Sequence, residues 1–346
     1  MSGGLLKYSG LVTKTKAMYG KLLSKEEIMR LAEYETVEEF LLFLKEGDGY
    51  APIYRSHEEI RHRAQVEEVI DDSLYADYGR LYQFAGTDTK RGMEILFFRY
   101  EVNVLKRCLE HVHQGGDNAR LGYLKVLFDR HASFDTEAVT RAEHMTELQQ
   151  ALSGTKYEPL INRFRENEEL SFADCMTQLD IFYYSTAWQM HKKLLDKQMR
   201  DIFAVLLGTE ADWQNIMWMY RAKRFYNRRP EDIYANMIPI AYRLKRGELR
   251  NLLETEQEET FIEILGKTAY FTEREPTVKL GDEITFRQVV DKTYRRLCRK
   301  YPMSVAPVLA YLHDKENEID TLTTILEGVR YQLPAREIQE LVISTS

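Results

Sequence analysis

The chain has 346 residues, of which 44% are hydrophobic and 30% are charged, and its formal net charge at pH 7 is −7. This length is enough to bury a large core, and the composition is typical of a soluble globular protein. A general nucleic-acid binder needs a dominant positive field to displace counterions from phosphates, so the negative charge argues against that class. The longest dense apolar run, residues 202–207, is far too short to span a bilayer, and no signal peptide is evident at the start. We therefore expect no direct membrane insertion.

Helix-breaking residues are sparse. The chain holds only 8 Pro and 18 Gly, and both types cluster between long runs in which apolar residues recur with a helical period. This distribution favours helices over a β fold with many turns, so we predict an all-α protein. Cys108, Cys175 and Cys298 are odd in number, far apart and embedded in helical patterns, which is typical of reduced core thiols in a cytosolic protein.

A nine-residue motif, Leu-x-x-x-Glu-(Ile/Leu)-x-x-Leu, occurs three times, at residues 23–31, 244–252 and 333–341. Its apolar positions fall near one side of a helix, and its Glu lies next to that side. The residues that follow the first two copies also match: Phe40, Leu44 and Tyr50 after the first, and Phe261, Leu265 and Tyr270 after the second. A degenerate copy over residues 137–157 ends in Tyr157. Each of these small units is too short to be stable alone and must dock on another element.

Longer, strongly periodic segments separate the small units. Each is predicted to hold a long helix, a turn, a second helix and then a third that opens on acidic residues, at Tyr100-Glu101, at Gly208 to Asp212 and at Asp314 to Glu318. Acidic residues in a first turn suit the positive end of the helix dipole. The alternation predicts three similar domains, residues 1–116, 117–231 and 232–346, the last with a closing helix. We expect them around a pseudo-threefold axis, with a stacked solenoid as the open alternative.

No sequence motif calls for an enzyme. Gly266-Lys267-Thr268 resembles the end of a phosphate loop, but Phe261 stands where the leading glycine is required and no strand precedes it. This segment is predicted to be the C-terminal end of a helix.

Two Glu-x-x-His spacings suggest a different chemistry. Glu59 with His62 and Glu110 with His113 have the spacing used in di-metal carboxylate sites, which also need two further Glu residues on facing helices. The second pair lies at a helix end before two glycines, where solvated side chains are common, and a surface role is the favoured interpretation. We expect no catalytic residue, cofactor or metal ligand.

The densest basic run lies near the end of the helix expected after Asp212. Two interpretations remain open. Arginine interleaved with aromatic residues is typical of a protein-binding hot spot, whereas cations at a helix C-terminus also interact with the helix dipole. The candidate partner-binding residues are Arg221, Lys223, Arg224, Phe225, Arg228 and Arg229.

Several stretches together carry a family resemblance. They are Gly10-Leu-Val-x-x-x-Lys16-Ala-Met, Leu22-Leu-Ser-Lys-Glu-Glu-Ile28 with Tyr34-Glu-Thr-Val-Glu-Glu-Phe40, Tyr100-Glu-Val-Asn103-Val, Ala211-Asp-Trp-Gln-Asn215-Ile, and Lys315-Glu-Asn-Glu-Ile319. With them, essentially the whole chain resembles the C subunit of bacterial and archaeal A/V-type rotary ATPases, which is similar to the d subunit of the vacuolar enzyme. One departure is that Thr321 stands where the other two copies carry Asn103 and Asn215.

The resemblance implies a funnel-shaped, all-α protein seated on the membrane rotor ring. It implies a non-catalytic central-stalk subunit of a V-type (A/V-type) ATPase or ATP synthase, peripheral on the cytoplasmic face of the cell membrane. Its partners would be the D- and F-type stalk subunits and the proteolipid ring, so that it couples rotation to proton or sodium transport. The alternatives are a helical scaffold with an unknown partner and a di-metal enzyme using Glu59, His62, Glu110 and His113.

Overall fold

The computed structural model describes residues 2–55, 63–114, 124–167, 170–226, 229–255, 257–271 and 283–345. Within these ranges every regular element is a helix, which confirms the prediction of an all-α protein. None of the helices in the described ranges has the length and apolar composition needed to cross a membrane. The residues group into two compact units: unit 1 comprises residues 1–90, 117–141 and 297–346, and unit 2 comprises residues 91–116 and 142–296. The three predicted domains and their pseudo-threefold axis stay predictions.

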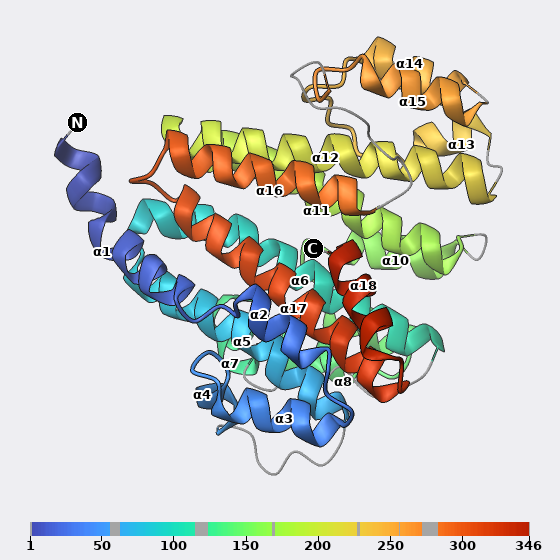
Figure 1. The fold of residues 1–346 in the computed structure, drawn as a ribbon. Helices are drawn as coiled ribbons and strands as arrows, with labels where there is room; N and C mark the ends of the chain where they lie inside the picture. The colour runs from blue at the N-terminus through green and yellow to red at the C-terminus, as the bar shows by residue number, and fades with distance from the viewer. Residues whose placement is uncertain are drawn as a thin grey trace. The chain divides into compact units, whose positions relative to one another are not determined.

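Unit 1 is organised around one long helix, α17, against which α1, α2, α3, α5 and α18 all pack (Figure 1). Short helices α4 and α7 pack on α5, and α8 packs on α7. The helices of this unit are α1 (Ser2–Tyr19), α2 (Lys25–Leu31), α3 (Val37–Glu46), α4 (Ala51–Tyr54), α5 (Arg63–Phe84), α7 (Leu124–His131), α8 (Thr136–Arg141), α17 (Ala306–Arg330) and α18 (Ala335–Thr345).

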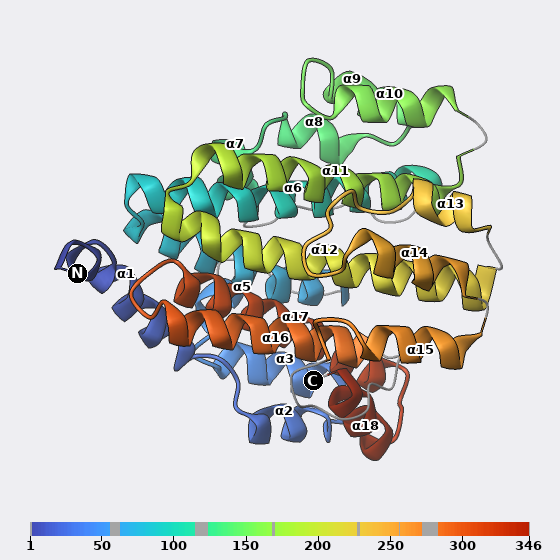
Figure 2. The same cartoon turned by 90° about the horizontal axis from the view of Figure 1, so that it is seen from above.

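Unit 2 is built on a pair of long helices, α11 and α12, that lie side by side (Figure 2). The short helices α13, α14 and α15 follow one another beside the C-terminal part of α12. The helices of this unit are most of α6 (Thr87–Gln114), α9 (Met145–Ala151), α10 (Glu158–Glu166), α11 (Phe172–Leu194), α12 (Lys197–Tyr226), α13 (Pro230–Ala235), α14 (Arg246–Glu254), α15 (Glu258–Gly266) and most of α16 (Glu283–Lys300).

Local sequence signals set several helix ends. Thr36 caps α3: the Thr36 hydroxyl accepts from the Glu39 backbone N–H at 3.3 Å, and the Glu39 carboxylate accepts from the Thr36 N–H at 3.3 Å. Such a capping box satisfies two amides that the helix itself cannot pair. Gly266 ends α15, as predicted for the Gly266 to Thr268 segment.

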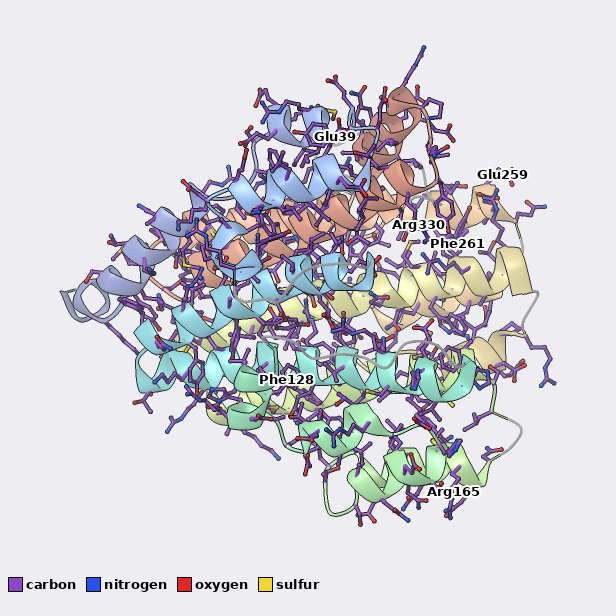
Figure 3. All side chains as sticks on the ribbon, turned by 90° about the horizontal axis from the view of Figure 1, so that it is seen from below. Glu39, Phe128, Arg165, Glu259, Phe261 and Arg330 are labelled. Atoms are coloured by element: carbon purple, nitrogen blue, oxygen red, sulfur yellow. The ribbon has the colours of Figure 1, made fainter. Side chains whose placement is uncertain are left out.

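Aromatic side chains attach the short helices to the long ones. In unit 1 the Phe128 ring on α7 lies 6.2 Å from the Tyr75 ring on α5, and in unit 2 the Phe261 ring on α15 lies 6.0 Å from the Tyr220 ring on α12. Figure 3 labels Phe128 and Phe261. Edge-to-face and tilted contacts at this distance are the favoured geometries of aromatic pairs. The short helices are therefore docked on their neighbours, as their length requires.

The predicted helix starts at acidic residues are wrong. Helix α6 runs without interruption through Tyr100-Glu101, α12 through Gly208 to Asp212, and α17 through Asp314 to Glu318. Helix α12 continues through Gly208. The glycine allows the Tyr242 side chain to lie against the helix, since a Cβ at this position would overlap the ring of Tyr242. The acidic residues lie in mid-helix, where Glu101, Asp212 and Glu318 accept hydrogen bonds from the short segments that dock on these helices.

Candidate functional site

A buried carboxylate in α17 binds the N-terminal part of unit 1. Glu318 accepts the Tyr50 hydroxyl on Oε1 at 2.6 Å and the Leu23 backbone N–H on Oε2 at 2.5 Å. Lys315, one turn earlier on α17, donates to Oε1 of Glu318 at 2.7 Å, and its Nζ lies 3.9 Å from the centroid of the Tyr50 ring. Lys315 and Glu318 retain only 2% and 6% of their surface exposed. A buried ion pair is tolerated only where its remaining hydrogen-bonding capacity is satisfied, and Tyr50 and Leu23 do this here.

A second buried carboxylate, Asp212, has the same role on α12. The Tyr270 hydroxyl donates to its Oδ2 at 2.8 Å. Three consecutive backbone amides, those of residues 242–244, donate to its two oxygens at 2.7–3.1 Å. Burial raises the pKa of the Asp212 carboxyl above its ordinary value, and these hydrogen bonds, which favour the charged form, oppose that rise. Backbone amides thus take the place that the lysine ammonium has at Glu318.

The third site of this kind lies on α6. Glu101, 2% exposed, accepts the Tyr157 hydroxyl at 2.8 Å and the Lys156 ammonium at 2.7 Å on the same oxygen. The Lys156 Nζ also lies 4.0 Å from the centroid of the Phe98 ring. In contrast to Lys315, this lysine comes from the short segment that docks on the helix and not from the helix itself.

These three contacts, Glu318 with Tyr50, Asp212 with Tyr270 and Glu101 with Tyr157, are called the acid–tyrosine pairs below. The sequence pattern marks the tyrosines as the ends of the small units and predicts the acids as helix starts, but no local motif connects the two series. The available signal was that both series recur at similar intervals along the chain. The pairs show that each repeated tyrosine docks on a long helix through one buried acceptor.

The expected equivalence of Asn103 with Asn215 is wrong. Asn215 lies three residues after Asp212 and is buried, with its side chain bonded to the backbone N–H and carbonyl of Ile238 at 2.8 and 2.9 Å. Thr321 lies three residues after Glu318 and is buried as well. Asn103 follows Glu101 by only two residues, so it points to another side of its helix and is exposed.

The basic run at the end of α12 is largely bound to its own chain. The Lys223 ammonium donates to the backbone carbonyl of Leu253 at 2.6 Å and to that of Thr255, at the C-terminal end of α14. A cation at this place satisfies carbonyls that a helix leaves unpaired and suits its negative dipole end. Arg224 forms an ion pair with Glu258 at 2.8 Å and donates to the Tyr220 hydroxyl. Together with Thr255, Gln257 and Phe261, these side chains line a pocket of about 150 Å³.

The other predicted partner-binding residues differ in exposure. Arg221 is exposed on α12, and Arg229 is exposed and pairs with Asp232 at 3.1 Å. Phe225 belongs to the last turn of α12. The side chain of Phe225 and the whole of Arg228 lie outside the described residues. The structure therefore brings Lys223 and Arg224 together around α14 and α15 and leaves Arg221 on the surface.

The residues considered for a di-metal site are not gathered by the described part of the chain. Glu110 and His113 are exposed near the end of α6, where the His113 ring stacks on Phe172 of α11 with centroids 4.8 Å apart. Glu59 and His62 lie outside the described residues. Among the residues that are described, no group of three or more His, Cys, Asp or Glu side chains is placed to hold a metal ion.

Comparison with known proteins identifies relatives along nearly the full length. The sequence model of the ATP synthase (C/AC39) subunit family matches residues 11–341, a range that includes all three acid–tyrosine pairs. The C subunit of the A-type ATP synthase of Methanosphaera stadtmanae is 24% identical over 343 residues, which cover 95% of this chain and 86% of that protein. Its counterpart in Methanosarcina acetivorans is 25% identical, covering 98% and 94%, and that in Archaeoglobus fulgidus is 22% identical, covering 99% and 97%. The chain belongs to the family of ATP synthase C/AC39 subunits.

Proposed function

We propose that this protein is a non-catalytic central-stalk subunit of an A/V-type ATP synthase or ATPase, and that it serves as a socket between the rotating stalk and the membrane proteolipid ring. The observation that carries the proposal is the family match over residues 11–341, together with relatives that are named as C subunits of A-type ATP synthases. Its partners would be the D- and F-type stalk subunits on one side and the ring on the other. It would then lie on the cytoplasmic face of the membrane, attached through the complex, and take part in proton or sodium transport without carrying the ion.

The packing of the long helices is compatible with transmitting torque. Close-packed protein interiors have low compressibility and pass strain from one element to the next. In unit 1, helix α17 buries fifteen residues along its length and packs against α1, α2, α3, α5 and α18. In unit 2, α12 contributes Trp213, Ile216 and Tyr220 to one core cluster with α14 and α15. Such helices resist shear, which a coupling element requires.

The acid–tyrosine pairs support three similar structural repeats, and each pair joins residues that lie in two different predicted domains. Each pair joins a repeated tyrosine to a buried acid on a long helix: Glu318 on α17, Asp212 on α12 and Glu101 on α6. A contact of the same kind between one domain and the next is what three homologous domains would retain. An adaptor with its own pseudo-symmetry is suited to grip a symmetric ring, because similar surfaces then meet similar subunits.

We propose that the stalk contacts the basic run at the C-terminal end of α12, in which Arg221 is the side chain to test first. Lys223 and Arg224 bind the carbonyls of α14 and the Glu258 carboxylate, so reversing their charge would disturb α14 and α15 as well as a partner. Arg221 is exposed on the same helix end. Lys197, exposed at the opposite end of α12, provides a matched control on the same helix.

The test is binding of the purified full-length chain to the D- and F-type stalk subunits of the same organism, by size-exclusion chromatography and calorimetry. A stable complex with one copy of each protein is expected. Arg221→Glu should weaken it by roughly threefold to tenfold, and less at high salt, because a charge at the rim of an interface acts through screened long-range attraction. Lys197→Glu should bind as the unmodified chain does. Unchanged binding by Arg221→Glu would move the interface elsewhere, and failure to bind either stalk or ring would favour a scaffold with another partner.

A further inference from the structure

The turn between α11 and α12 in unit 2 is strongly basic, although the formal net charge of the chain is −7. Residues 192–200 are called the lysine turn below. Its exposed cations are Lys192, Lys193, Lys197 and Arg200. The single acid in the sequence between residues 181 and 200 is Asp196. No ion pair joins the four cations to a carboxylate of the described part of the chain. Their charges are therefore accessible to an external anion.

The packing of the two helices holds the lysine turn in place. Helices α11 and α12 lie side by side, and Leu195 and Met199 in the turn are buried. The Asp196 carboxylate accepts the Met199 backbone N–H at 2.9 Å, which satisfies one of the unpaired amides at the start of α12. Leu194, in contrast, keeps 44% of its surface exposed. The turn thus presents an apolar side chain among cations on a rigid support.

An aromatic ring accompanies the lysines. The Lys192 Nζ lies 4.9 Å from the centroid of the Trp188 ring, one turn earlier on α11. Lysine–aromatic contacts also occur in unit 1 at the ends of α5 and α16, where the pairs are Lys14 with Phe84 at 5.4 Å and Lys300 with Tyr301 at 5.0 Å. Aromatic rings next to lysines whose charged ends reach water are typical of side chains at a membrane–water interface. This arrangement recurs at three turns of the chain.

The two ends of α12 differ in the cations that they present. The basic run at the C-terminal end, residues 221–229, has four arginines and one lysine, whereas the lysine turn has three lysines and one arginine. Arginine is enriched and lysine is depleted at protein–protein interfaces. Clusters of basic residues beside a membrane, lysines included, bind anionic lipid headgroups. The composition of the lysine turn therefore favours a lipid surface over a protein partner.

We propose that the lysine turn is a site of direct contact with the anionic headgroups of a membrane surface. The ammonium groups of Lys193 and Lys197 meet the lipid phosphates, and the exposed Leu194 enters the headgroup region. The contact is peripheral and requires no helix that crosses the bilayer. Helix α12 has 30 residues and is roughly 45 Å long, so its two ends can bind stalk and lipid together. Lipid contact goes beyond the socket role, and the chain alone can show it without stalk or ring.

Co-sedimentation of the full-length chain with lipid vesicles tests the contact. At low salt the chain should bind phosphatidylcholine vesicles that contain phosphatidylglycerol, and should not bind phosphatidylcholine alone. High salt should abolish binding, because it screens exposed charges. Lys193→Glu with Lys197→Glu should weaken binding at least tenfold, since each basic side chain near an anionic surface contributes about fivefold. Leu194→Ser should weaken it by about threefold through lost apolar burial. Absence of binding to the anionic vesicles at low salt would overturn the proposal.

A matched double variant separates the lysine turn from an effect of net charge. Arg163→Glu with Arg165→Glu changes the charge by the same amount at two exposed positions of α10, where Figure 3 labels Arg165. This variant should bind the anionic vesicles as the unmodified chain does. Equal losses in the two double variants would contradict a specific site at the turn.

Two further measurements distinguish lipid from protein as the partner of the lysine turn. Arg221→Glu, the variant that tests the stalk contact, should leave vesicle binding unchanged, so each contact can fail without the other. The purified proteolipid ring provides the protein alternative. If the chain binds the ring but not the vesicles, and Lys193→Glu with Lys197→Glu weakens ring binding, the turn contacts protein and the lipid proposal is wrong.

Discussion

Helix α12 around Asp212 and helix α17 around Glu318 place a buried acid at the same kind of position but compensate it differently. Glu318 has a lysine one turn away on its own helix, at 2.7 Å, and accepts one backbone amide. Asp212 accepts three consecutive amides, from residues 242–244, in addition to the Tyr270 hydroxyl. The fold therefore requires a buried acceptor where the repeated tyrosine docks and does not prescribe what balances its charge.

The largest loss of stability is expected from a substitution of Asp212, the acid that accepts three consecutive backbone amides. Asp212→Ala would leave the buried Leu244 N–H, the part-buried N–H groups of Tyr242 and Arg243 and the Tyr270 hydroxyl without their acceptor, each at a cost of roughly 1–3 kcal/mol when it cannot reach water. Part of this cost is relieved by relaxation, so we expect the free energy of unfolding in urea to fall by about 4 kcal/mol or more. Asp201→Ala, at an exposed position on the same helix, should change it by less than about 0.5 kcal/mol. Equal effects of the two variants would show that Asp212 does not hold residues 242–244.

The sequence reveals the local part of this architecture. Helices begin at capping boxes such as Thr36 with Glu39, and an exposed glycine such as Gly266 ends one, because these signals act within a few residues. The all-α class and the repeated tyrosines follow from periodicity in the same way. Acids in mid-helix are ambiguous by comparison, since Asp212 after Gly208 has the same pattern as a helix N-terminus.

The contacts that define the sites join residues far apart in the chain, and no local pattern encodes them. Tyr50 meets Glu318 because α3 and α17 pack together, which neither segment alone specifies. The contact of Lys223 is also set by a distant segment. The local sequence predicts a solvent-exposed cation, but the Lys223 ammonium donates to the carbonyl groups of Leu253 and Thr255 at the end of α14. The C-terminal carbonyls of a docked helix can therefore account for a cation that the basic run alone would assign to a partner.

Alanine variants of glycines should change stability by less, and they should distinguish glycines against which another side chain packs closely from those with open space around them. Gly208→Ala in α12 would place a Cβ into the Tyr242 ring, and Gly328→Ala in α17 would place one 2.7 Å from Cγ1 of Ile338. We expect each to lower the free energy of unfolding by about 1–3 kcal/mol, the usual cost of overpacking. Gly247→Ala in the first turn of α14, where nothing lies within 4 Å, should raise it by about 0.5–1 kcal/mol, because alanine lowers the conformational entropy of the unfolded chain. A neutral Gly208→Ala would mean that Tyr242 moves aside easily, and that the approach does not fix the amides of residues 242–244.

The smallest expected effect is a pH dependence that distinguishes Asp212 from an ordinary surface acid. Burial raises the pKa of its carboxyl in the folded protein above the ordinary value of 3.8. Between the ordinary and the raised pKa the folded state binds more protons than the unfolded state, so the contribution of Asp212 to stability falls as the pH rises through this window. Glu27 provides the opposite case, since its hydrogen bonds to Ser24 lower its pKa and its contribution is lost as the pH falls.

Unfolding in urea at several pH values between 4 and 7 measures this difference. Because asparagine does not titrate, Asp212→Asn removes the proton uptake, and its destabilisation relative to the unmodified chain should be greatest at the acidic end and shrink toward neutral pH. For Glu27→Gln the destabilisation should instead grow toward neutral pH. Should the Asp212→Asn destabilisation also grow with pH, the amides of residues 242–244 and the Tyr270 hydroxyl would outweigh burial. Asp212 would then be held as a charged acceptor as fully as the lysine-paired Glu318, and the two helices would differ only in the source of the donors.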